Sequence, residues 1–176
     1  MGGRIVLVEN ALALPTLPAA ADVRMINTVP SAIAELVRLN GLPDTLLTVN
    51  LAGEPLSTKL VNDIYATGKV QRVYDLYGPS EDTTYSTWTL RQPQQPATIG
   101  KPIWNTQAYI MDACMQPTPI GVPGELYLGG AGVTRGYLGK PELTAERYVS
   151  NPYSDDPSLR LYRTGDKARY RADGNI

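Results

Sequence analysis

Four short runs of β-branched and other apolar residues, separated by segments of helical length, constrain the fold of the first half of the chain most strongly. The runs cover residues 4–8, 23–28, 46–51 and 72–76. Each run is continuous rather than alternating, which is typical of strands buried on both faces of a parallel sheet. The sequence therefore predicts an α/β architecture, a parallel sheet with flanking helices.

Two of the intervening segments have helical spacing and end signals. Residues 31–39 place Ile33, Leu36 and Val37 on one stripe, with Ser31 as the expected cap and Gly41 just past the end. Residues 57–66 repeat the pattern and close at Gly68. We predict a helix over each segment.

The pattern of apolar, proline and glycine residues changes after about residue 84. Short segments such as 91–96 and 116–124 are separated by Pro and Gly, which favours short strands in an antiparallel or barrel-like β layer. Residues 141–149 form the last predicted helix. We expect an α/β part over residues 1–83 and a β-rich part over 84–176, both within a single partial domain. Residues 2–9 enter a strand at once and residues 173–176 read as a turn opening a strand, so we expect a fragment of a larger protein.

Composition excludes several function classes. The chain has no histidine, which removes Ser-His-Asp, Cys-His and His-ligated metal chemistry. Its 16 basic and 17 acidic residues leave a net charge of -1, which does not favour a nucleic-acid or membrane partner. The single cysteine, Cys114, is predicted to be a small core residue. The sequence contains neither a long apolar run nor a signal peptide, so we expect a cytoplasmic protein.

The segment from Asp75 to Glu81 has the strongest chemical content. It follows a predicted buried strand, and open α/β sheets bind ligands at the carboxyl ends of their strands. Gly78 makes a tight turn, Ser80 offers a hydroxyl to an anion, Glu81 offers oxygen to Mg²⁺, and Tyr77 offers a flat face to a base. These properties favour a ligand site, and the alternative is an ordinary loop.

Two other segments contain loops with possible chemistry. Residues 129–136 look like a dinucleotide fingerprint, but Arg135 occupies the position of the last glycine and no helix follows directly. We interpret this run as a flexible loop that lets chain or ligand approach closely. Asp166 follows a short strand, where its carboxylate could accept both hydroxyls of a ribose or lie in a surface turn.

The order and spacing of three segments resemble amino-acid adenylation domains of nonribosomal peptide synthetases, within the wider adenylate-forming family. Residues 75–81 are similar to the motif Asn-x-Tyr-Gly-Pro-Thr-Glu, residues 124–148 follow the long Gly-Glu-Leu to Pro-Glu-Leu-Thr motif, and residues 162–166 match Tyr-Arg-Thr-Gly-Asp. The resemblance covers nearly the whole chain. It implies part of the large N-terminal subdomain of these enzymes.

The resemblance implies a role for each matching residue. Tyr77 would face the adenine beside Gly78, Ser80 would contact the phosphates, Glu81 would bind Mg²⁺, and Asp166 would hold the ribose. Two positions depart from the family pattern, because Asp75 replaces Asn and Lys167 replaces Leu. Asp75 can accept a hydrogen bond from the adenine amine but cannot donate one.

The same resemblance implies a pocket for an amino-acid side chain. Its expected residues are Asn27, Asn50, Ala52, Leu76, Thr84 and Tyr85. Leu76 and Tyr85 would occupy volume, and no member supplies a counter-charge, so a small substrate is expected. Alanine is favoured, then glycine, and serine stays open because two asparagines could bind a hydroxyl. The alternative is that these residues belong to the core or the sheet.

The implied reaction activates the amino acid with ATP and Mg²⁺ and loads it onto the phosphopantetheine thiol of a carrier protein, with condensation domains as further partners. The family's phosphate loop, its amine-binding aspartate and its C-terminal lysine are not in this sequence. We therefore expect the isolated chain to show negligible activity and to aggregate through an unpaired sheet edge. An acyl-CoA ligase and a non-catalytic module that binds nucleotide or a partner are the alternatives.

Overall fold

The computed structural model describes residues 3–176, and these residues fall into two compact units. The first unit contains the chain up to Asp75 together with Leu90–Ala97, and the second contains Leu76–Thr89 and Thr98–Ile176. The chain thus leaves the first unit in the middle of a strand, returns for one short stretch and leaves again.

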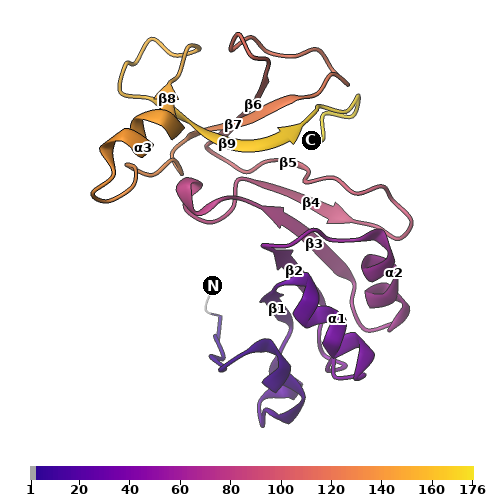
Figure 1. Cartoon of the computed structure of the whole chain (residues 1–176). Helices are drawn as coiled ribbons and strands as arrows, with labels where there is room; N and C mark the ends of the chain where they lie inside the picture. The colour runs from indigo at the N-terminus through magenta and orange to yellow at the C-terminus, as the bar shows by residue number, and fades with distance from the viewer. Residues whose placement is uncertain (1–2) are drawn as a thin grey trace. The chain divides into compact units, whose positions relative to one another are not determined.

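Strands and helices alternate in the first unit (Figure 1). Its elements are the short 3-10 helices η1 (Ala11–Thr16) and η2 (Ala20–Asp22), β1 (Met25–Thr28), α1 (Pro30–Arg38), β2 (Thr48–Ala52), α2 (Thr58–Ala66) and the start of β3 (Arg72–Tyr77). β1 and β2 pair in parallel. The core packs Ile33 and Leu36 of α1 and Val61 and Ile64 of α2 with residues of the sheet. The predicted parallel sheet with flanking helices is confirmed.

Of the two predicted N-terminal helix caps, one is wrong and one is confirmed. α1 begins at Pro30, and Ser31 does not cap it; its backbone N–H and Oγ donate to the Glu54 carboxylate at 2.9 and 2.8 Å. Proline suits the first turn because it lacks an N–H that would need a partner. α2 is capped as predicted, because Leu60 N donates to Ser57 Oγ at 3.1 Å.

Gly41 lies just past the end of α1, as predicted, and Asn40 precedes it. Asn40, with φ of 51°, takes the left-handed position, and Gly41 follows it. Gly41 N donates to Leu36 O at 2.8 Å and Asn40 N donates to Val37 O at 3.0 Å. This pair of bonds is the Schellman arrangement, and asparagine tolerates the left-handed conformation it requires.

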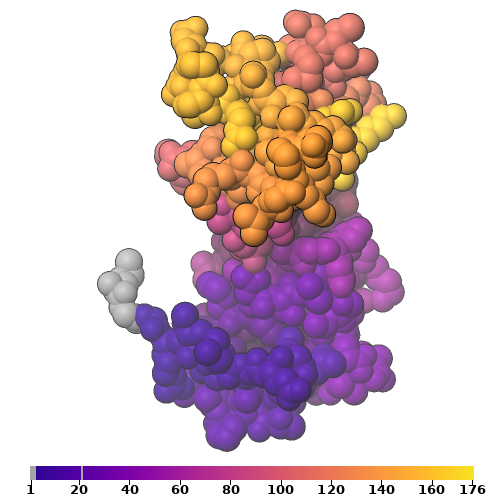
Figure 2. All heavy atoms as spheres, turned by 60° about the vertical axis from the view of Figure 1, so that its left-hand side comes forward, coloured from indigo at the N-terminus to yellow at the C-terminus, as the bar shows by residue number. Residues whose placement is uncertain are grey.

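The strand predicted over residues 4–8 is wrong, and the strand nearest to it is less buried than expected. Residues 3–8 have no regular structure, and Ile5 and Leu7 are 84% and 90% exposed. Figure 2 shows this indigo stretch at the surface of the first unit. β1 is not buried on both faces, since Met25 is 58% exposed. Apolar residues form a strand only where a neighbouring strand accepts their backbone hydrogen bonds.

The second unit is built mainly of antiparallel strands. It contains η3 (Ser80–Asp82), β5 (Lys101–Pro102), β6 (Thr106–Met111), β7 (Gly124–Gly130), α3 (Pro141–Arg147), β8 (Tyr148–Ser150) and β9 (Arg160–Ala168), while β4 (Thr87–Arg91) belongs to both units. The strand order is β6-β7-β9-β8 in one sheet and β1-β2-β3-β4-β5 in the other. Ile110, Leu126 and Leu128 form part of the core of the second unit. The predicted antiparallel layer is confirmed.

Several local predictions in this half are wrong. Only Arg91 of residues 91–96 lies in a strand, and within 116–124 only Gly124 does, with Pro117 in an isolated bridge. The last helix ends at Arg147, where the chain continues directly into β8. α3 has no buried residue, and Figure 2 shows its orange atoms at the surface.

Cys114 is exposed, contrary to the prediction of a core position. Asp112 Oδ1 accepts hydrogen bonds from the backbone N–H groups of Cys114 and Gln116, so the cysteine lies in a tight surface turn.

Among the described residues, no helix has the length and apolarity needed to cross a bilayer.

Candidate functional site

The loop that follows β3 carries Glu81 and is folded tightly on itself. Ser86 N donates to Tyr77 O at 2.7 Å, which closes the loop at its base. A Cβ added at Gly78 would lie 2.7 Å from backbone atoms of Thr84, Tyr85 and Ser86, so only glycine fits there. Ser80 begins η3 and is exposed. The turn predicted from Gly78 thus presents Ser80 and Glu81 from a fixed backbone.

Two phenols approach the Glu81 carboxylate. The Tyr137 hydroxyl donates to Glu81 Oε1 at 2.5 Å, and the Tyr162 hydroxyl lies 3.5 Å from that of Tyr137. Burial by itself raises the pKa of Glu81, but the hydrogen bonds from Tyr137 and Tyr162 and the charge of Arg147 outweigh it. The pKa lies below the ordinary value for glutamate, so the group is an anion at neutral pH.

The run of residues 129–136 fixes the Glu81 loop. Thr134 N donates to Glu81 O at 2.8 Å, and Thr83 Oγ1 donates to Gly132 O at 2.7 Å. A Cβ at Gly132 would lie 2.5 Å from Asp82 Oδ1. The close approach predicted for this glycine-rich run is confirmed, and the segment that approaches is the Glu81 loop.

Tyr77 and Asp166 are 89 residues apart in sequence and meet in the second unit. The Tyr77 hydroxyl donates to Asp166 Oδ2 at 2.5 Å, and burial, followed by the bond to Asp166, raises the pKa of Tyr77 well above its ordinary value. Asp166 N donates to Thr164 Oγ1, which in turn donates to Leu126 O. Asp166 is exposed on β9, and its carboxylate is oriented by Tyr77.

Asp75 has a partner that the sequence patterns missed. Arg91 Nη1 donates to its Oδ2 at 2.7 Å, and the arginine is 1% exposed. The only feature of the sequence that pointed to this ion pair was one arginine, Arg91, in a run predicted as an ordinary strand. The predicted contact of Asp75 with adenine stays a prediction, and one of its carboxylate oxygens is already bound.

Three of the six predicted pocket residues share a sheet face in the first unit. Asn27 and Asn50 are directly paired across β1 and β2. Ala52 lies two residues beyond Asn50, while the alternating Val49 and Leu51 face the core. The parallel register therefore places Asn27, Asn50 and Ala52 together on the face away from the core.

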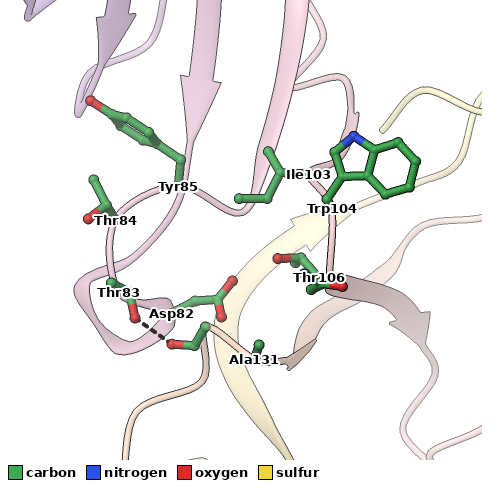
Figure 3. Close-up of a pocket in the computed structure, with 10 residues that line it drawn as sticks. Asp82, Thr83, Thr84, Tyr85, Ile103, Trp104, Thr106 and Ala131 are labelled. Carbon is green, nitrogen blue, oxygen red and sulfur yellow. Dashed lines mark hydrogen bonds between the residues drawn. The ribbon is translucent and has the colours of Figure 1, made fainter. Parts of the chain in front are cut away.

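The other three predicted pocket residues lie in the second unit. Leu76 is half-buried on β3, while Thr84 and Tyr85 line a cavity of about 380 Å³. Asp82, Ile103, Trp104, Asn105, Thr106 and Gly132 also line this cavity. In Figure 3 the Tyr85 and Trp104 rings point away from each other. Asp82, which the sequence did not single out, is 1% exposed, and neither of its carboxylate oxygens has a hydrogen-bond partner among the described residues.

Residues 1–138 match the family model described as AMP-binding enzyme. The chain belongs to the AMP-binding enzyme family. It is 56% identical over 177 residues to a linear gramicidin synthase of Brevibacillus parabrevis, a match that covers 99% of this chain and 3% of that protein. The chain thus spans only a small part of the length of this curated relative.

Solved structures of AMP-binding proteins have the same fold. The N-terminal subdomain of Klebsiella oxytoca NpsA, in complex with 3-hydroxyanthranilyl-AMSN, superposes with a TM-score of 0.80 at 28% identity over 96% of this chain and 42% of that one. A four-domain nonribosomal peptide synthetase, holo-AB3403 bound to AMP and glycine, gives 0.81 at 31% identity over 95% of this chain and 12% of that one. The predicted fold, part of the N-terminal subdomain of adenylate-forming enzymes, is confirmed.

The residues present fit a magnesium ion that arrives with a nucleotide. Within residues 3–176, no group of three or more Cys, Asp or Glu side chains could enclose a metal. Mg²⁺ commonly uses one or two carboxylates and completes its shell with phosphate oxygens and water. Glu81, ionised and beside the exposed Ser80, is a single carboxylate of the kind that such a metal uses.

Proposed function

We propose that this chain provides part of the ATP site of an amino-acid adenylation domain in a nonribosomal peptide synthetase. The observation that carries the proposal is the Glu81 carboxylate, which accepts a hydrogen bond from the Tyr137 hydroxyl and directly follows Ser80 in the loop after β3. The Tyr77–Asp166 pair in the same unit supports it, because an aromatic face and an oriented carboxylate suit a nucleoside. The chain would be one part of a single domain, with an α/β portion up to residue 83 and a β-rich portion after it.

In the proposed reaction, a carboxylate oxygen of the amino acid attacks the α-phosphorus of ATP. The bond between the α-phosphorus and the bridging oxygen breaks, which releases pyrophosphate and leaves aminoacyl-AMP. Bound Mg²⁺ would neutralise charge on the phosphate oxygens. Ser80 would donate its hydroxyl to a phosphate oxygen, Tyr77 and Asp166 would hold the nucleoside, and Glu81 would hold the metal. No step needs a general base, which agrees with a chain without histidine.

The proposed substrate is a small amino acid, alanine first and glycine second. The residues predicted for the pocket carry no charge, since Asn27, Asn50 and Ala52 are polar or small and Leu76 and Tyr85 are bulky. A charged substrate side chain would lack a partner among these residues. The related synthetase bound to AMP and glycine supports a small substrate. Serine is the next candidate, because the paired asparagines can hydrogen-bond a hydroxyl.

The proposed partners follow from the reaction. Aminoacyl-AMP would react with the phosphopantetheine thiol of a carrier domain, and condensation domains of the same cytoplasmic synthetase would use the product. The similarity to a linear gramicidin synthase and to a four-domain synthetase supports this setting. An acyl-CoA ligase is the second enzymatic candidate, and a non-catalytic nucleotide-binding or partner-binding module is the third.

The test is amino-acid-dependent exchange of pyrophosphate into ATP, measured over a substrate panel with a polypeptide extended past both ends of this chain. We expect the fastest exchange with alanine or glycine, and loss of at least about 100-fold in Glu81→Gln. Glu146→Gln, an exposed glutamate on α3, is the matched control and should retain activity. Exchange with a larger amino acid would reject the pocket, and exchange with no amino acid would reject amino-acid activation.

A further inference from the structure

The backbone at Tyr137 is fixed by the start of α3. Gly136 has φ of 134°, and a Cβ there would lie 2.3 Å from Thr144 Cγ2. Tyr137 N donates to Thr144 Oγ1 at 2.9 Å, and that hydroxyl donates to Lys140 O. Thr144 of α3 therefore contacts the chain before Tyr137, at Gly136, and after it, at Lys140. These contacts fix the backbone from which the Tyr137 side chain extends.

The Tyr137 ring is also restricted by its neighbours. The Tyr148 ring meets it edge-on, with centroids 5.8 Å apart and planes at 75°. Tyr148 is held in turn, since its hydroxyl pairs with Thr134 Oγ1 at 2.7 Å and the Arg160 guanidinium lies 5.2 Å from its ring centroid. These contacts leave the Tyr137 hydroxyl little freedom except to reach Glu81 Oε1.

We propose that Tyr137 is a positioning residue that fixes the orientation of the Glu81 carboxylate towards the metal-nucleotide complex. The inference rests on the proposed function of the same site. The hydrogen bonds from Tyr137 and Tyr162 occupy only part of the acceptor capacity of the carboxylate and leave the rest available to a cation.

The chemistry of the donor supports this role. A lysine or arginine at this distance would form an ion pair and neutralise the carboxylate, whereas a phenol is uncharged at neutral pH and preserves the negative charge. A carboxylate that is oriented before the metal arrives does not have to lose side-chain freedom on binding. Tyr137 thus restricts the orientation of the Glu81 carboxylate without neutralising its charge.

The first experiment measures metal binding directly, in the polypeptide extended past both ends of the chain. Mn²⁺ replaces Mg²⁺, a non-hydrolysable ATP analogue is present, and free Mn²⁺ is followed by electron paramagnetic resonance. We expect Tyr137→Phe to weaken nucleotide-dependent Mn²⁺ binding about tenfold, because a hydrogen bond to a charged group is lost while the ring is kept. The half-saturating Mg²⁺ concentration in pyrophosphate exchange should rise by a similar factor, with KM for the amino acid unchanged.

Two further variants separate positioning from packing. Tyr153→Phe removes a hydroxyl that donates to Met115 O and has no contact with Tyr137 or Glu81, so it should leave Mn²⁺ affinity unchanged. Glu81→Gln/Tyr137→Phe should bind Mn²⁺ no more weakly than Glu81→Gln alone, since Tyr137 acts through Glu81. A Tyr137→Phe protein that binds Mn²⁺ like wild type overturns this inference and leaves the proposed function intact. Absence of nucleotide-dependent Mn²⁺ binding in the wild type overturns both.

Discussion

Arg91 Nη1 lies 2.7 Å from Asp75 Oδ2 in the interior of the first unit. The same nitrogen also donates to Leu56 O at 3.1 Å, and Arg91 is almost completely buried. Burial raises the pKa of Asp75 above its ordinary value, and the arginine opposes that effect. Each charge therefore depends on the other, and the pair joins the end of β4 to the strand that leads into the Glu81 loop.

Replacing Arg91 by methionine should destabilise the protein by about 3 kcal/mol, because Asp75 would keep its place in the interior without a cationic partner. The free energy of unfolding in urea measures the effect. Lys59→Met removes one member of an exposed pair with Asp63 and should change it by less than about 0.5 kcal/mol. Equal effects of the two substitutions would contradict a structural role for the buried pair.

Gly132→Ala should destabilise the second unit by about 1–3 kcal/mol, because the new methyl group would lie 2.5 Å from Asp82 Oδ1. It should also disturb the loop that carries Glu81, since Thr83 donates to Gly132 O. Gly3→Ala, where a Cβ meets nothing within 4 Å, is the matched control. A thermal midpoint of Gly132→Ala equal to that of Gly3→Ala would show that the two segments do not pack this closely.

Stability should fall as the pH rises above about 10, the ordinary pKa of tyrosine. Burial raises the pKa of Tyr170, whose hydroxyl donates to Ala108 O at 2.6 Å, and it also raises those of Tyr127 and Tyr162. The folded state keeps these protons where the unfolded state loses them, so the stabilisation is complete below the unfolded pKa and is lost above it.

Tyr170 provides the test of this pH dependence. The urea midpoint should decline less steeply between pH 9 and 11 in Tyr170→Phe than in wild type. Tyr153→Phe, which removes a hydroxyl bound to Met115 O in the exposed part of the unit, serves as the comparison. Identical slopes in Tyr170→Phe and wild type would exclude Tyr170 as a contributor.

Cys114 should react with a thiol reagent such as dithionitrobenzoate in the native protein, because its side chain is exposed. We expect one thiol per chain to react without denaturant, at a rate that urea changes little. Reaction only after unfolding would mean that the cysteine is buried, as its composition-based prediction had it.

The sequence was most informative where the signal is local or repeated. The spacing of apolar residues identified α2, because one buried helix face imposes a period that can be read along the chain. Continuous apolar runs identified the strands that became β1, β2 and β3. Ser57 was recognised as a cap because capping depends on residues within one turn. The Gly78 turn was likewise evident from its own residues.

The strand at residues 4–8 and the burial of Cys114 were mispredicted for a common reason. An apolar run has strand propensity, but it becomes a strand only when a partner lies beside it, and a small apolar residue is buried only if its loop faces the core. The residues of a segment do not encode whether a neighbouring strand lies beside it or whether its loop faces the core. Ser31 failed similarly, because its actual partner, Glu54, is 23 residues away.

The sequence by itself determined the residue types of the site and the local turns that present them, since those depend on neighbours along the chain. Only the tertiary structure decided the pairs Tyr137 with Glu81, Tyr77 with Asp166, and Arg91 with Asp75. These contacts join residues 56, 89 and 16 positions apart. The first two pairs depend on how β7 and β9 align and on how the Glu81 loop meets residues 132–134. The third depends on the placement of β3 beside β4. In each case the packing of segments distant in sequence fixes the geometry.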